Sequence, residues 1–164
     1  SDNYEILNSF ETTRYQKISE MVTKVSFYGK AINTLSGDDV RISKRLFIPG
    51  SKLRGFESGK IGPIENNDYI GGNYVSAINF SATLPQLLPS FQNMDFSLFV
   101  DAANVWGVDY DSAINDNSKI RSSTGIGLDL LTPVGPLSFS FSQPITKNSS
   151  DTTETFRFNL GTTF

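Results

Sequence analysis

The chain has 164 residues, which suits a single domain, and its formal net charge of −3 gives no electrostatic basis for binding nucleic acid. It contains neither Cys nor His. This excludes disulfides, thiolate chemistry, His-bearing metal sites and nucleophilic catalysis by Ser–His or Cys–His pairs. We therefore expect a protein that is not an enzyme and that uses no cofactor.

The composition is rich in aromatic residues without being strongly apolar: there are 13 Phe and 6 Tyr, yet only 38% of residues are hydrophobic. Aromatics separated by Ser, Thr, Asn and Gly are typical of strands whose two faces meet different surroundings. No apolar stretch approaches the roughly 18–20 residues of a membrane-spanning helix. A membrane protein with this sequence would therefore be a β-barrel, which also satisfies its own backbone hydrogen bonds in lipid.

Seven segments alternate between apolar and small polar side chains, which is the period of a β-strand. Most are longer than the roughly 5–6 residues usual in soluble domains and suit strands that cross a bilayer, which need about 9–11 residues. Short turns alternate with longer polar loops, as in outer-membrane barrels, and the connection 36–71 is the longest. In chain order, we expect strands at about residues 3–17, 20–35, 72–85, 94–107, 118–132, 136–145 and 154–164.

The alternation also predicts which way the side chains face. We expect the even-numbered residues of 74–84 and 96–102 to point outward, and Asn79 and Asp101 to point inward. Ser, Gly and Asn dominate the inward positions, which indicates a crowded or wet lumen. The alternative is a soluble β-sandwich or lipocalin-like barrel with an apolar interior.

The last segment, 154–164, alternates in the same way and ends the chain on Phe164. A terminal aromatic is typical of outer-membrane barrels, where aromatic girdles lie at the membrane interface, although an ordinary sheet-edge strand is the alternative. We expect its aromatic and leucine side chains to face lipid. Arg157 and Asn159 would then face the lumen, because Arg on the lipid face costs roughly 2–4 kcal/mol at the bilayer midplane.

Several motifs recur in one order along residues 45–164. The long connection contains Pro49–Phe56, and an Asp-containing strand motif follows at Phe99–Trp106. The turn Pro133–Leu137 and the ending Phe158–Phe164 complete the series. In order and spacing these motifs resemble the BamA-type family of outer-membrane assembly factors.

The resemblance implies an all-β fold: an antiparallel up-and-down transmembrane β-barrel of sixteen strands, preceded by periplasmic POTRA domains. Residues 1–164 would supply about seven of those strands, with 36–71 as a loop that folds into the lumen and with the POTRA domains absent. The polar, acidic start of the chain is no secretory signal, so we expect a mature end or, more simply, a cut inside a longer protein.

The function that the resemblance implies is that of a core subunit which folds and inserts β-barrel proteins into the outer membrane of a Gram-negative bacterium. Its partners would be outer-membrane lipid, client β-barrel proteins and accessory assembly lipoproteins bound through the missing POTRA domains. We expect an isolated fragment to self-associate through its edge strands.

The resemblance also assigns roles to residues of the long loop. Arg54 would pair with an acidic group on the inner wall, here Asp101, while the second acidic position of the family holds the neutral amide of Asn79. We expect the missing carboxylate to weaken this latch and to leave Asn79 as a partner that gives a neutral hydrogen bond. The lumen-loop motif consists of Leu53, Arg54, Gly55 and Phe56, where Gly55 permits a close approach to the wall and Phe56 fills the lumen.

The final strand would be one side of the lateral seam and would carry the C-terminal assembly signal. The residues implied are Phe158, Leu160, Gly161 and Phe164. Gly161 is expected to interrupt side-chain packing and to weaken the strand.

Other functions stay open. A polypeptide-transporting pore or a TamA-like member of the same superfamily would share the fold, and a soluble ligand-binding β-barrel is a remote alternative. Asp109, Asp111 and Asp116 lack the closing Glu of a calcium loop, so we expect no metal site.

Overall fold

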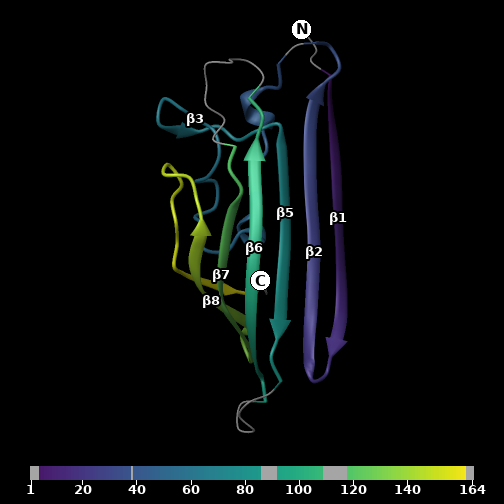
Figure 1. Ribbon diagram of the computed structural model, residues 1–164, viewed down its shortest axis with the longest axis vertical. Helices are drawn as coiled ribbons and strands as arrows, with labels where there is room; N and C mark the ends of the chain where they lie inside the picture. Colours follow the sequence, from purple (N-terminus) through teal and green to yellow (C-terminus); the bar gives the residue numbers. More distant parts are fainter. Residues whose placement is uncertain (1–3, 38, 86–91, 109–117, 162–164) are drawn as a thin grey trace.

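A computed structural model describes residues 4–37, 39–85, 92–108 and 118–161 of the chain. Its main feature is a seven-stranded antiparallel sheet in the order β1-β2-β5-β6-β7-β8-β9 (Figure 1). Among the described residues, no helix is long and apolar enough to cross a membrane. The main strands are β1 (Glu5–Ile18), β2 (Met21–Thr34), β5 (Tyr74–Thr83), β6 (Met94–Trp106), β7 (Arg121–Thr132), β8 (Gly135–Thr146) and β9 (Phe156–Leu160).

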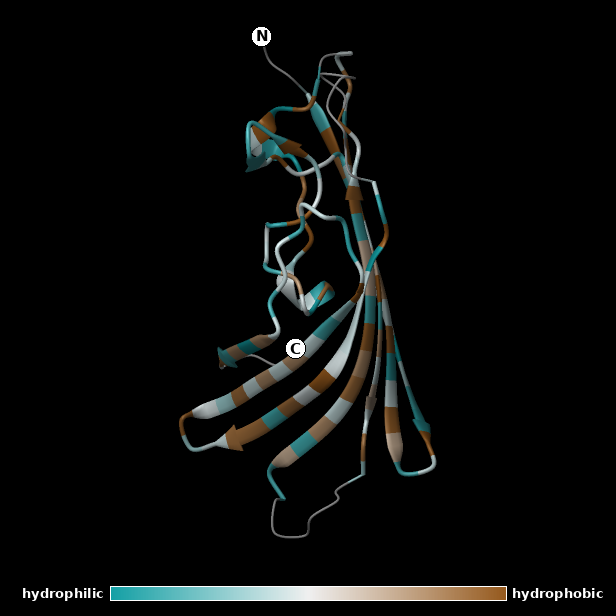
Figure 2. Ribbon diagram, turned by 60° about the vertical axis from the view of Figure 1, so that its left-hand side comes forward, coloured by the Kyte–Doolittle hydropathy of each residue, from teal (hydrophilic) through white to brown (hydrophobic). Residues whose placement is uncertain are grey.

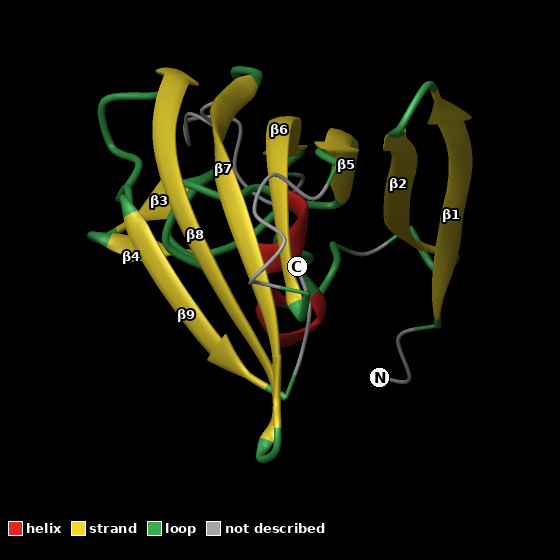
Figure 3. Ribbon diagram, turned by 90° about the horizontal axis from the view of Figure 1, so that it is seen from below, coloured by secondary structure: helices red, strands yellow, loops and turns green. Residues whose placement is uncertain are grey.

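Each main strand pairs with the next main strand along the chain, and β2 pairs with β5 although the long connection separates them in sequence. This confirms the predicted all-β, antiparallel up-and-down architecture. Within the described residues the sheet stays open, with β1 and β9 as its edges. Seen from below, the strands form a curved wall (Figure 3).

The long connection lies to one side of this wall (Figure 2). It contains two short 3-10 turns, η1 (Ile42–Lys44) and η2 (Gly50–Lys52), and a small hairpin of β3 (Ile64–Glu65) and β4 (Asp68–Tyr69). The sequence did not predict that hairpin, because two-residue strands are too short to show a period.

The predicted facing of the side chains is confirmed in β5 and β6. Ile78 and Phe80 are 42% and 43% exposed on the outer face, as are Leu98 and Val100 at 48% and 45%, whereas Asp101 is fully buried on the inner face. A soluble barrel with an apolar interior would show the reverse pattern. That alternative is therefore wrong for this fold.

The inner face differs from the prediction in one respect. Part of it is apolar, because the long connection covers it and builds a core there. Leu53, Phe56 and Ile61 of the connection pack against the inward side chains of β5 and β6, including Val75 and Val105. Farther along the wall, the buried inward side chains of β7 and β8 are mostly Ser.

The last strand is shorter than predicted. β9 has five residues and ends at Leu160, since Gly161 turns the backbone with φ +83°. At its other end, Thr153 forms an isolated bridge with Phe56 of the long connection instead of continuing the sheet. Alternation alone could not predict either boundary, because both depend on the backbone beside the strand.

Candidate functional site

The centre of the site is a buried ion pair between the long connection and the sheet. Arg54 donates from Nε to Asp101 Oδ2 and from Nη2 to Asp101 Oδ1, both at 2.8 Å. Its backbone N–H also donates to Oδ2 at 3.0 Å. The side chains are 7% and 0% exposed, and the guanidinium carbon lies 3.7 Å from the centre of the Phe99 ring. This two-point geometry is the strongest form of an Arg–carboxylate contact.

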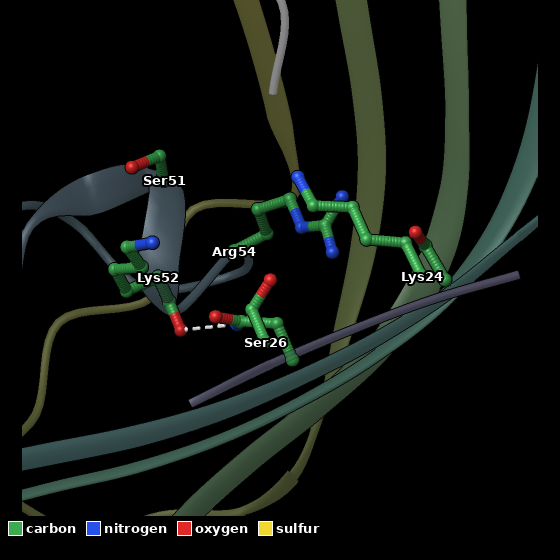
Figure 4. Close-up of a pocket in the computed structure, with 7 residues that line it drawn as sticks. Lys24, Ser26, Ser51, Lys52 and Arg54 are labelled. Atoms are coloured by element: carbon green, nitrogen blue, oxygen red, sulfur yellow. Dashed lines mark hydrogen bonds between the residues drawn. The ribbon is translucent and has the colours of Figure 1, made fainter. Parts of the chain in front are cut away.

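Asn79 lies beside this pair, directly opposite Asp101 in the β5–β6 register. Its Nδ2 donates to Asp101 Oδ1 at 2.9 Å and to the Lys52 carbonyl at 2.8 Å, the latter drawn as a dashed line in Figure 4. The amide thus supports the carboxylate and holds the loop backbone at once, two donations that an ionised carboxylate could not make.

Gly55 brings the loop against the wall. Its φ is +94°, and a Cβ there would lie 3.0 Å from Ser142 Cβ and 3.2 Å from Ser123 Cβ. A residue with a side chain would meet both a strained backbone and a crowded wall. On either side of the Arg54–Gly55 step, Leu53 and Phe56 are 1% and 2% exposed.

The C-terminal strand places its side chains as the alternation predicts. Phe158 and Leu160 are 49% and 59% exposed on the outer face, and the Phe158 ring lies 5.1 Å from that of Phe139. Gly161 follows the strand instead of lying within it, and its N–H donates to the Pro136 carbonyl at 2.7 Å. Phe164 is outside the described residues.

Arg157 joins this strand to the long connection, a contact that the sequence did not predict. Its Nη1 donates to the Gly50 carbonyl at 2.6 Å and its Nη2 to the Phe56 carbonyl at 2.7 Å. The inward facing of Arg157 follows from the alternation. Its acceptors do not, because every residue carries a backbone carbonyl.

A second buried ion pair fixes the loop between β8 and β9. Arg121 donates to both carboxylate oxygens of Asp151, at 2.8 and 3.0 Å, and both side chains are fully buried. Arg121 also donates to Asn104 Oδ1 at 2.8 Å. An inward Arg indicates that a carboxylate partner lies nearby. The sequence could not identify Asp151 as that partner, because Asp151 lies in a loop without periodicity.

A cavity of about 180 Å³ opens beside Arg54 on the concave side of the sheet (Figure 4). Lys52 reaches from its rim to an ion pair with Glu11 of β1. Within the part of the chain that the structure describes, no three acidic side chains lie together as metal ligands would. Asp109, Asp111 and Asp116 fall outside that part. The cavity is lined by Lys24, Ser26, Ser51, Lys52, Arg54, Asn79 and Ser81.

Comparison with known proteins places this arrangement in context. A family model described as "Omp85 superfamily domain" matches residues 6–164. The chain is 32% identical over 141 residues to "Outer membrane protein assembly factor BamA" of Neisseria meningitidis. The matched region covers 68% of this chain and 17% of that relative. The chain is also 28% identical over 132 residues to the protein of the same name in Neorickettsia risticii, covering 79% of this chain and 18% of the relative.

The similarity extends to a eukaryotic protein and to a solved structure. The "Sorting assembly machinery 50 kDa subunit" of Saccharomyces cerevisiae is 32% identical over 121 residues, covering 70% of this chain and 25% of that protein. The crystal structure of BamA from Haemophilus ducreyi lacking POTRA domains 1–3 matches with a TM-score of 0.86 and 28% identity, covering 96% of this chain and 35% of that one. The chain thus spans less than a fifth of the two bacterial relatives that it matches.

Proposed function

Because the chain belongs to the Omp85 superfamily, we propose that it is part of an assembly factor that folds β-barrel proteins and inserts them into the outer membrane of a Gram-negative bacterium. The observation that carries the proposal is the likeness to the Haemophilus ducreyi BamA barrel over 96% of this chain. Two bacterial relatives are named as outer-membrane assembly factors, which supports the same assignment.

The proposed activity is exchange of strands at an edge of the sheet, without covalent chemistry or a cofactor. An edge strand presents N–H and C=O groups that can pair with an incoming strand of a client protein. β9 suits this role because it is an edge within the described sheet and has five residues, against 12 in its neighbour β8. A short pairing breaks at a lower cost than a long one.

The long connection would stay bound to the inner wall while that edge opens. Arg54 fastens the connection to Asp101 in the middle of the inner wall, and Gly55 lets it approach β7 and β8 closely. We propose that this Arg54–Asp101 latch keeps the inner wall in place while the edge strand β9 moves. In this proposal the complete barrel has sixteen strands and is preceded by POTRA domains, through which accessory lipoproteins bind.

The proposal is tested by placing the full-length protein in lipid vesicles and adding an unfolded outer-membrane barrel as the client. Folding of the client is followed by its heat-modifiable mobility on gels and by its protection from protease. We expect faster client folding than in protein-free vesicles, and a slower rate with the Asp101→Ala variant. If client folding is unchanged while an unfolded polypeptide enters the vesicle lumen, the protein is a polypeptide-transporting pore instead.

A further inference from the structure

The support of the edge strand β9 comes from two sides, and the sheet supplies only one of them. Its register with β8 runs from Phe141–Phe156 to Leu137–Leu160. One backbone hydrogen bond continues the pairing at each end, from the Ser142 N–H to the Thr155 carbonyl at 2.8 Å and from the Gly161 N–H to the Pro136 carbonyl at 2.7 Å. On the inner face, β9 is also contacted by the long connection. The position of β9 therefore depends on a segment that lies about a hundred residues earlier in the chain.

Arg157 makes the central contact on that inner face. Its side chain is 14% exposed, and bonds of 2.6 and 2.7 Å reach the carbonyls of Gly50 and Phe56. Its Nη2 also forms a longer ion pair with Glu154 Oε2 at 3.3 Å, three residues earlier in the chain. Hydrogen bonds from a charged guanidinium are stronger than those between neutral groups. The two acceptors lie on either side of Arg54, the residue bound to Asp101. The Arg157 guanidinium thus binds the loop on both sides of Arg54, which is itself bound to the wall through Asp101.

The backbone before β9 continues this contact. The Glu154 N–H donates to the Gly55 carbonyl at 2.9 Å, and the Glu57 N–H donates to the Thr152 carbonyl at 2.9 Å. Between them, Phe56 and Thr153 form an antiparallel bridge. The long connection therefore acts as a short extra strand beside the segment that leads into β9.

We propose that Arg157 is a positioning residue that couples the seating of the long connection to the position of β9. With Arg54 bound to Asp101, the carbonyls of Gly50 and Phe56 are held where Arg157 can reach both, and β9 stays on the wall. When the connection leaves the wall, those acceptors move and β9 loses its inner support. The inference rests on the proposed function only for the meaning of β9 as the exchange edge.

Amide hydrogen exchange of the full-length protein in detergent tests this coupling. In Arg157→Gln, we expect residues 156–160 to exchange roughly tenfold faster or more, because the amide cannot replace a charged two-point donor. The β1–β2 hairpin serves as the internal reference and should keep its rate. Unchanged exchange in β9, or an equal increase in β1 and β2, would overturn the proposal.

Gly50→Ala gives a matched second variant that leaves Arg157 in place. The backbone at Gly50 is outside the left-handed region, and an added Cβ would lie 2.9 Å from Arg157 Nη1, the end of a flexible side chain. The new methyl group should displace the guanidinium at little other cost. We expect β9 to exchange faster in this variant too, by less than in Arg157→Gln; no change would contradict the role of the Gly50 contact.

The coupling itself is measured by combining Arg157→Gln with Asp101→Asn, which weakens the hold on Arg54. Asp101→Asn alone should raise exchange in β9, and it should add little more once Arg157 is replaced. Fully additive effects would overturn the coupling. Because exchange is measured without a client protein, its outcome is independent of the assembly assay, and either proposal can fail alone.

Discussion

At the scale of single residues, the ion pair of Arg54 and Asp101 carries the first prediction. Removing one partner leaves a buried charge without compensation, which costs about 3–5 kcal/mol of stability. Arg54→Ala and Asp101→Ala are each expected to destabilise the full-length protein by that order. Denaturant unfolding in detergent, combined as a double-mutant cycle, should give a coupling above the roughly 0.2–1 kcal/mol of exposed pairs.

Arg54→Lys is the matched control for this cycle. A lysine keeps the charge but presents a point donor in place of a planar fork, so the loss should be smaller than for alanine. Zero coupling between Arg54→Ala and Asp101→Ala would mean that the two side chains do not stabilise each other. That result would contradict the proposed role of the Arg54–Asp101 ion pair in holding the long connection on the wall.

The sequence could predict this pair and could not predict the others. Asp101 faces inward by alternation, and the family motif supplied its partner Arg54. The acceptors of Arg157 are backbone carbonyls, and the partner of Arg121 lies in an irregular loop. Asn79 was expected beside the latch with a neutral hydrogen bond, but its donation to the Lys52 carbonyl was not, because every residue carries a backbone carbonyl.

At the scale of elements, alternation predicted all seven main strands, since the period of a strand is a local property of the chain. It failed where a boundary depends on another segment. The strand expected from residue 154 begins only at Phe156, because the long connection pairs with the residues before it, and within the described residues the strand ends at Leu160, before the turn at Gly161. The apolar core inside the wall was missed for the same reason: it exists only where the connection covers Val75 and Val105.

The close approach of the long connection gives a prediction at this scale. Gly55→Ala should unseat the connection, because its φ of +94° disfavours a side chain and the added Cβ would lie 3.0 Å from Ser142 Cβ. The left-handed backbone alone costs about 1–2 kcal/mol. The expected result is faster cleavage of residues 50–60 by an added protease.

Gly59→Ala separates the two causes. Gly59 also has a left-handed backbone, with φ +74°, but an added Cβ would have no neighbour within 4 Å. This variant should therefore suffer only the backbone cost and should be cleaved more slowly than Gly55→Ala. Equal cleavage of the two variants would show that the contact with the wall does not hold the connection in place.

At the scale of the whole molecule, the sheet leaves two edges and an apolar outer face. β1 and β9 each pair with one neighbouring strand within the described residues, and large apolar side chains are exposed along the outer face. Phe10, Phe80 and Leu98, for example, are 64%, 43% and 48% exposed. In water such a face drives aggregation, and in lipid it is the favourable face.

The open edges predict how these 164 residues behave when produced alone. We expect them to require detergent and to self-associate through β1 or β9, since unpaired edges template pairing with another copy.

The absence of native Cys allows single substitutions to report the contact. Thr12→Cys on the edge strand β1 should give disulfide-linked dimers under oxidation, whereas Thr124→Cys in β7, also exposed but inside the sheet, should not. Equal cross-linking at both positions would indicate association through the outer face, and a soluble monomer without detergent would contradict the membrane-facing role of that surface.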